Sequence, residues 1–144
     1  MRPELMLQPM LAVMLLTFAV WLGLYFTRIG EMKRQRVHPQ KMSTRAARTQ
    51  VDLGSAEARN SDNFMNLFEL PVIFHALCIT LYVTGAVDPA NLVLAWLFAA
   101  SRVAHSFIHV TYNRVLHRFA AYVFGGVVLL ALTLRTAWTL IFPG

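Results

Sequence analysis

The sequence predicts an all-α membrane protein that forms a bundle of four transmembrane helices. Of its 144 residues, 57% are hydrophobic and only 14% are charged. Soluble domains carry roughly 25% charged residues, so the exterior of this chain is expected to contact lipid. Four separate apolar segments are each long enough to cross a bilayer. We therefore interpret residues 1–144 as a single membrane domain.

The four predicted spans cover residues 5–26, 64–84, 91–112 and 119–142. Each has about 20–24 residues, which gives roughly 30–36 Å of helix and matches a hydrocarbon core of about 30 Å. Lipid offers no partner to backbone polar groups, so each span must be helical. We interpret the first span as a retained helix and not as a signal peptide. It is too long, and it ends in aromatic and charged residues without a cleavage site.

The loops predict the orientation of the bundle. Eight of the 13 Lys and Arg residues lie between Arg28 and Arg59, within the first loop at about residues 27–63. The third loop, residues 113–118, is also basic, whereas the second has no basic residue. By the positive-inside rule, the first and third loops are cytoplasmic and both termini lie on the non-cytoplasmic side. A basic block beside apolar spans favours contact with anionic lipid, so membrane lipid is an expected partner and nucleic acid is not.

Several local features have simpler interpretations. Residues 43–59 form either a short helix capped by Ser43 or Thr44, which would extend the second span or lie at the interface, or a solvated basic loop. Pro71 predicts a kink, and the pair Gly125 and Gly126 predicts close helix packing. Cys78 is the only cysteine, which excludes a disulfide within the chain and predicts a small core residue.

Ionisable side chains inside spans are costly and usually face the bundle interior. The second span carries Asn66 and Glu69, and the third carries Arg102, His105 and His109. In each span the spacing places these residues on one helix face, so we expect the two polar faces to meet. Glu69 would lie a turn or two from the cytoplasmic end of its helix. We predict a structural Glu69–Arg102 ion pair, which either only fixes helix packing or also supports a site.

The remaining polar residues leave alternatives open. His105 and His109 have chelating spacing, but a zinc site needs a third and usually a fourth ligand, so no metal is expected. The two histidines would instead form buried hydrogen bonds or line a ligand pocket. Arg118 lies at the predicted cytoplasmic mouth, with Tyr122 one turn deeper. Arg118 would anchor a lipid phosphate, hold an anionic ligand or stabilise a thiolate.

Two stretches resemble signatures of the MAPEG superfamily, the membrane-associated proteins in eicosanoid and glutathione metabolism. The first is ARNSDNFMNLFELPVIF, where an arginine, Asn-x-x-Glu and a proline-containing apolar run are similar to the family's second helix. The second is SRVAHSFIHVTYNRVLHRFAAY, which is similar to the family's third helix and the start of its fourth. The likeness is strongest over about residues 59–126. The matching positions are Arg59, Asn66, Glu69, Pro71, Arg102, His105, His109, Arg118 and Tyr122.

This resemblance implies a four-helix membrane protein that assembles as a homotrimer and binds glutathione as co-substrate between subunits. The function it implies is a glutathione-dependent transferase or peroxidase that attacks small lipophilic substrates with a thiolate. Arg118 would be the catalytic residue that stabilises this thiolate. The alternative is a non-catalytic trimeric membrane protein that binds another small anion or a lipid, or acts as a scaffold. By resemblance, the glutathione pocket would be lined by Asn66, Glu69, His105, His109, Arg118 and Tyr122.

The chain also departs from the pattern that it resembles. Family members usually have a tyrosine where His109 stands, and often further arginines between the positions of Arg59 and Asn66. Here that interval contains Asp62, which would repel a carboxylate. The stretch NFMNLFE resembles the bacterial branch of the family, which implies a multi-pass protein of the bacterial inner membrane.

Overall fold

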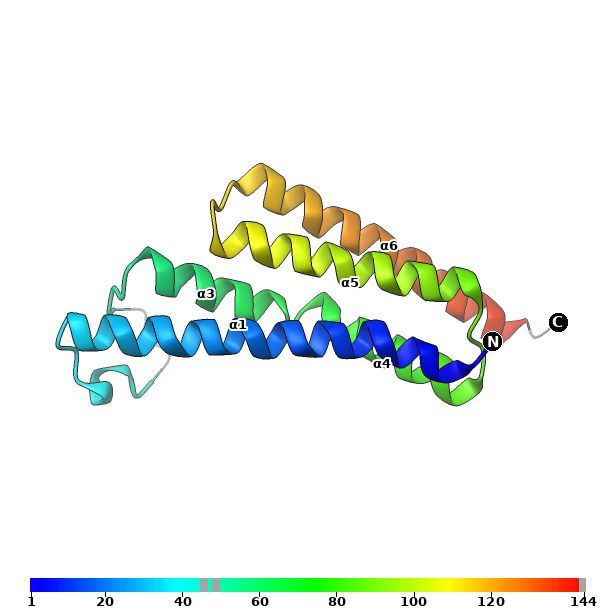
Figure 1. Cartoon of the computed structure of the whole chain (residues 1–144), viewed down its shortest axis with the longest axis horizontal. Helices are drawn as coiled ribbons and strands as arrows, with labels where there is room; N and C mark the ends of the chain where they lie inside the picture. The colour runs from blue at the N-terminus through cyan, green and yellow to red at the C-terminus, as the bar shows by residue number, and fades with distance from the viewer. Residues whose placement is uncertain (45–46, 48–49, 143–144) are drawn as a thin grey trace.

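A computed structural model describes residues 1–44, 47 and 50–142, and within these residues every regular element is a helix (Figure 1). Four helical segments of the described chain are long and apolar enough to cross a membrane, which confirms the predicted fold class. Their bounds are Pro3–Arg34, Ser55–Thr84, Pro89–Val110 and Val115–Ile141. The elements in chain order are η1 (Pro3–Met6), α1 (Leu7–Arg34), η2 (Pro39–Met42), α3 (Ser55–Asn66), α4 (Leu70–Thr84), α5 (Pro89–Val110) and α6 (Val115–Ile141).

Helices α1 and α3 extend well beyond the predicted spans. The apolar run of the first span ends near Phe26, but α1 continues to Arg34. Arg28 forms an ion pair with Glu57 of α3, with 2.6 Å between Nη2 and Oε1, so these polar extensions pack against each other. The segment before the second span is therefore partly helical, and Gly54 precedes α3. The predicted cap at Ser43 or Thr44 borders residues 45–46 and 48–49, which lie outside the described residues.

The second span is two helices and not the single predicted helix. Helix α3 ends at Asn66 and α4 begins at Leu70. Glu69 lies at the break with φ −96° and ψ −103°, outside the helical range. Pro71 occupies the first turn of α4, where it removes a backbone N–H donor and its ring would clash with the carbonyl four residues earlier in a continuous helix. The predicted kink at Pro71 is confirmed, and at this break the backbone of Glu69 leaves the regular helical conformation.

The helices form an elongated bundle whose two termini lie at the same end. Figure 1 shows α1 running along α3 and α4, with α5 and α6 as an antiparallel hairpin on the other side. The α4–α5 turn lies at the end with the termini, and the α5–α6 turn lies toward the opposite end, which also holds the basic loop after α1. The bundle thus has one basic end and one end with the termini, as the loop pattern predicts.

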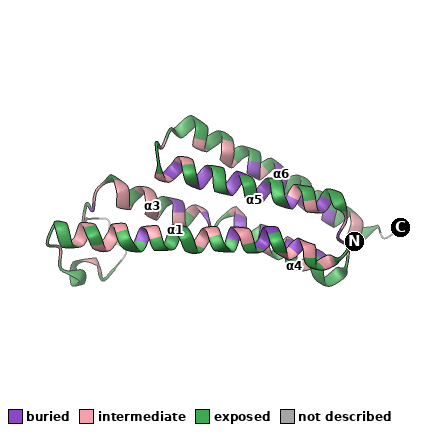
Figure 2. Cartoon of the chain, viewed as in Figure 1, coloured by how far each residue is buried: buried purple, intermediate pink, exposed green. Residues whose placement is uncertain are grey.

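The core lies along the centre of the bundle. Phe74 and Phe98 are fully buried with ring centroids 4.5 Å apart, and they pack beside Leu81, Leu132 and the buried Cys78. This position confirms that Cys78 is a small core residue. Figure 2 shows buried residues concentrated on the inward faces, while most of the outer surface is exposed. That outer surface includes many large apolar side chains, as expected for helices in lipid.

Candidate functional site

His105 connects three elements near the middle of the bundle. Its Nδ1 lies 3.1 Å from the backbone oxygen of Arg118 at the start of α6, and its Nε2 lies 3.4 Å from Nδ2 of Asn66 at the end of α3. A carbonyl oxygen only accepts hydrogen bonds, so Nδ1 carries the proton and Nε2 accepts from Asn66. His105 is therefore a neutral imidazole in this arrangement, and it is almost fully buried.

Arg118 is held in place by two neutral partners. Its Nη1 donates to Nε2 of His109 at 3.1 Å and to Oδ1 of Asn113 at 2.9 Å. Asn113 lies in the α5–α6 turn with φ 47°, a left-handed conformation that Asn tolerates better than most residues. Among the described residues, no carboxylate lies within 4.0 Å of the Arg118 guanidinium. Within this part of the chain the guanidinium charge is thus unneutralised, and neither Nε nor Nη2 donates a hydrogen bond.

Glu69 and Tyr122 form the open edge of this network. The hydroxyl of Tyr122 donates to Oε2 of Glu69 at 3.0 Å. The ring of Tyr122 lies 5.7 Å from that of His105, which in turn lies 5.6 Å from the ring of His109. Glu69 itself is exposed on the surface of the single chain. The structure therefore brings together all six residues that the sequence proposes for one pocket, namely Asn66, Glu69, His105, His109, Arg118 and Tyr122.

Comparison with known proteins identifies the family of this chain. A family model described as the MAPEG family matches residues 6–138, which is nearly the whole chain. The chain belongs to the MAPEG family. This confirms the resemblance seen in the second, third and fourth spans. Searches of curated proteins and of solved structures found no significant match.

The surroundings of Arg102 in this MAPEG chain differ from the predicted ion pair with Glu69. The guanidinium is 1% exposed, and within the described residues it forms no ion pair with Glu69. Its Nη2 instead donates to the backbone oxygens of Ala121 and Tyr122, at 3.3 and 3.2 Å. Its Cζ also lies 5.0 Å from the Tyr122 ring centroid. Tyr122 therefore stands between the two charges, because its hydroxyl binds Glu69 and its ring covers Arg102.

Gly125 explains how the Arg102 guanidinium reaches the backbone of α6. A Cβ atom at Gly125 would collide with Oγ of Ser101 and with Nη2 of Arg102. At Gly126, the nearest atom to such a Cβ is Cδ1 of Leu70 at 3.7 Å, which is an ordinary contact. The predicted close packing thus involves Gly125 and not its neighbour.

Several polar residues that lie around this candidate site were not identified from the sequence. Asn63 is fully buried, and its Oδ1 accepts a hydrogen bond from the hydroxyl of Ser106 at 3.1 Å. Its spacing of three residues from Asn66 was an available signal for a second polar contact of α3. The part that Asn113 plays in holding Arg118 had no signal in the sequence, because it depends on the shape of the α5–α6 turn. His75, half-buried on α4, was also missed.

The histidine pair faces hydrogen-bonding partners and not a group of acidic ligands. Within residues 1–44, 47 and 50–142, no cluster of three or more His, Cys, Asp or Glu side chains is arranged to hold a metal ion. Nε2 of His105 and Nε2 of His109 both accept from neighbouring side chains. The chemistry available here is therefore that of buried and partly buried hydrogen-bonding groups beside the Arg118 guanidinium, which has no carboxylate partner among the described residues.

Proposed function

We propose that this MAPEG protein is a glutathione-dependent transferase or peroxidase that acts on lipophilic substrates. The observation that carries the proposal is Arg118, whose charge has no carboxylate partner among the described residues although two neutral side chains hold the group in place. A positioned and unneutralised guanidinium is suited to bind an anion. Here the anion would be the glutathione thiolate.

The surrounding groups suit the other parts of glutathione, a tripeptide with one ammonium, two carboxylates and a thiol. The exposed carboxylate of Glu69 would accept from the ammonium group. Asn66 and the neutral His105 would bind peptide groups, and Tyr122 would orient Glu69 through the hydrogen bond between them. Arg118 would lower the pKa of the thiol by stabilising its ionised form.

The reaction would begin with the thiolate that Arg118 stabilises. In transfer, the glutathione sulfur forms a bond to an electrophilic carbon, and the leaving group departs with the bonding electron pair. In peroxide reduction, the thiolate sulfur forms a bond to one peroxide oxygen, the O–O bond breaks, and the alcohol leaves after it takes up a proton, so the sulfur becomes a sulfenic acid. A second glutathione then completes a disulfide, and the products are an alcohol and water. The lipid phase around the helices would supply the apolar co-substrate.

Assembly as a homotrimer would explain the exposure of Glu69. This carboxylate lies a turn or two inside the apolar run that begins near Phe64, yet it is open on the surface of a single chain. An ionised side chain that faces lipid at that depth is costly, and such residues normally face a protein interior. A second copy packed over Glu69 and Tyr122 would remove this cost and close the pocket. The basic end would then face the cytoplasm of a bacterial inner membrane.

A matched pair of arginine variants tests the proposal. Arg118→Ala should abolish thiolate absorbance and weaken glutathione binding by at least about tenfold, because a hydrogen bond to a charged group contributes about 1.5–3 kcal/mol. Arg114→Ala is the control, because Arg114 is exposed and precedes α6 by one residue. Glutathione binding and thiolate absorbance are measured on the purified protein in detergent. Absence of wild-type binding at millimolar glutathione would overturn the proposal.

The sequence between Arg59 and Asn66 favours a second candidate, a non-catalytic trimer that binds another small anion or a lipid. This interval holds no arginine, and the exposed Asp62 adds a negative charge there. Fewer cations near the pocket would weaken the hold on the glutathione carboxylates. Anion binding that depends on Arg118, without turnover of electrophiles or lipid peroxides, would support this candidate against the enzyme.

A further inference from the structure

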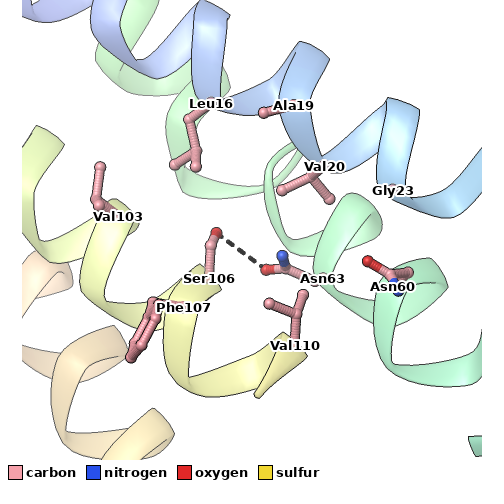
Figure 3. Close-up of a pocket in the computed structure, with 10 residues that line it drawn as sticks. All are labelled: Leu16, Ala19, Val20, Gly23, Asn60, Asn63, Val103, Ser106, Phe107 and Val110. Atoms are coloured by element: carbon pink, nitrogen blue, oxygen red, sulfur yellow. Dashed lines mark hydrogen bonds between the residues drawn. The ribbon is translucent and has the colours of Figure 1, made fainter. Parts of the chain in front are cut away.

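A cavity of about 350 Å³ lies between α1, α3 and α5 (Figure 3). Its volume falls at the lower end of the range of small-molecule sites, roughly 300–1,000 Å³. None of the six candidate site residues described above lines it. Helix α5 contributes Val103, Ser106, Phe107 and Val110 to the cavity, and not His105 or His109. Six of the residues that line it are Leu16, Val20, Asn63, Val103, Ser106 and Phe107.

The walls are largely apolar and open toward the outer surface of the bundle. Val103 is 50% exposed and Phe107 is 62% exposed, so the rim merges with the apolar surface that faces lipid. Three helices of one chain form the walls, so the cavity is complete without a second copy. An apolar chain from the surrounding bilayer can therefore enter it directly.

One polar group in the wall lacks a partner. Asn63 is 0% exposed, and Ser106 occupies its Oδ1. Its Nδ2 is buried and has no hydrogen-bond partner in the part of the chain that the structure describes. Figure 3 shows this amide among the residues that line the cavity, with its oxygen toward Ser106. A buried N–H group without an acceptor is costly, so this wall favours a ligand that brings an acceptor oxygen.

The charges beyond the cavity favour a phosphate on the same ligand. Arg28 lies about 7.5 Å beyond Gly23 along α1, given a rise of 1.5 Å per residue, and a phosphate there would share its guanidinium with Glu57, the ion-pair partner of Arg28. The last turn of the same helix adds the exposed Lys33, whereas Arg34 beside it is paired with Glu31. A phospholipid places its phosphate at a similar remove from its ester groups, with the acyl chain on the other side.

We propose that this cavity binds an acyl chain of a membrane glycerophospholipid. The ester carbonyl oxygen accepts a hydrogen bond from Nδ2 of Asn63, the chain lies against Leu16 and Val20, and the headgroup lies toward the basic end. This site is separate from the pocket around Arg118, so it stands or falls independently of the glutathione proposal.

Photolabelling with two matched lipids tests this assignment. The full chain is placed in phospholipid nanodiscs with a trace of phosphatidylcholine that carries a diazirine in one chain. That chain is joined by an ester in one probe and by an ether in the other. Mass spectrometry should find label on peptides that contain residues 16–23 and 103–110. The ester probe should label about two- to tenfold more than the ether probe, because only the ester offers a carbonyl acceptor.

Two variants separate the cavity from general lipid contact. Val103→Trp fills the rim and should reduce labelling several-fold, whereas Val93→Trp, on the same helix and 57% exposed, should not. Asn63→Leu should make the two probes label equally. Circular dichroism and gel filtration check that each variant folds. If Asn63→Leu does not fold, the labelling of the wild-type protein by the two probes still tests the proposal.

Three outcomes would overturn the proposal. The first is wild-type label spread evenly over the exposed faces of all helices. The second is unchanged labelling in Val103→Trp. The third is displacement of the probe by free fatty acid but not by unlabelled phospholipid, which would assign the cavity to fatty acids instead.

Discussion

Arg102 and Arg118 stand in the same bundle, but the two guanidinium groups have opposite surroundings. Arg102 is 1% exposed, donates to the backbone of α6 and lies against aromatic rings. Arg118 is partly exposed, and in the described part of the chain its guanidinium donates to the side chains of His109 and Asn113. The first group is enclosed by the fold, and the second remains open to a ligand. The two side chains are of the same type, so their positions in the bundle determine which guanidinium is enclosed and which is exposed.

The largest expected effect comes from the packing around Arg102. Gly125→Ala should destabilise the protein by about 1–3 kcal/mol, because the new methyl group overlaps Ser101 and Arg102 and the packed core must shift. Gly126→Ala should be neutral or slightly stabilising, because alanine favours helix and its Cβ has room. Thermal unfolding in detergent measures both variants. Equal unfolding temperatures would show that the contact between α5 and α6 is looser than described.

The second prediction concerns the support of Arg118. Asn113→Gly keeps the left-handed turn but removes the Oδ1 acceptor. Glutathione binding should weaken about fivefold, as expected for one lost hydrogen bond, while the unfolding temperature changes little. Isothermal titration measures the affinity. A large loss of stability with unchanged affinity would place Asn113 with Arg102 as an architectural residue.

The sequence predicted which polar side chains come together, because helical spacing determines which side chains share a face. Asn66, His105 and His109 could be assigned to facing helices from spacing and depth alone. In the structure, Asn66 forms a hydrogen bond with His105, and His109 forms one with Arg118. The Glu69–Arg102 pair was wrong for a physical reason. Reasoning from charge looks for an opposite charge, but a buried guanidinium can also donate to carbonyl oxygens that it reaches beside a glycine, as Nη2 of Arg102 does.

Helix ends were harder to predict than helix faces. The apolar run of the second span begins near Phe64, but α3 begins at Ser55 because polar contacts with α1 continue the packing. Glu69 therefore lies near the middle of the helical segment Ser55–Thr84, although it remains a turn or two inside the apolar part of that segment. Hydropathy detects the part of a helix that meets lipid, and it carries little information about extensions held by ion pairs.

The third prediction tests the residue that joins the two surroundings. Tyr122→Phe removes the hydroxyl that donates to Glu69 and keeps the ring against Arg102. Stability should be nearly unchanged, because Glu69 is exposed and its hydrogen bond with Tyr122 competes with solvent. Glutathione binding should weaken about threefold, because the hydroxyl no longer orients Glu69 toward the ligand. Binding and thermal unfolding are measured on the same samples. A drop in stability without a change in binding would mean that the Tyr122–Glu69 contact serves only the fold.

The smallest expected effect lies at the far end of the bundle, where Asp88 pairs with Arg135. Burial raises the pKa of Asp88, but the hydrogen bond from Arg135 and that from the backbone N–H of Asn91 outweigh it, so the pKa is lowered overall. A lowered pKa means that this pair stabilises the fold above about pH 4, and that the contribution is lost as the pH falls through the lowered value. Both side chains are partly exposed, so the contribution should stay below about 0.5 kcal/mol. Asp88→Asn can keep the Oδ1 acceptor that caps α5, but it removes the charge and the second oxygen that accepts from Arg135. The difference in unfolding temperature between wild type and variant should be largest near neutral pH and vanish below about pH 3. A difference that persists in acid would show that the cap, and not the charge, stabilises this end.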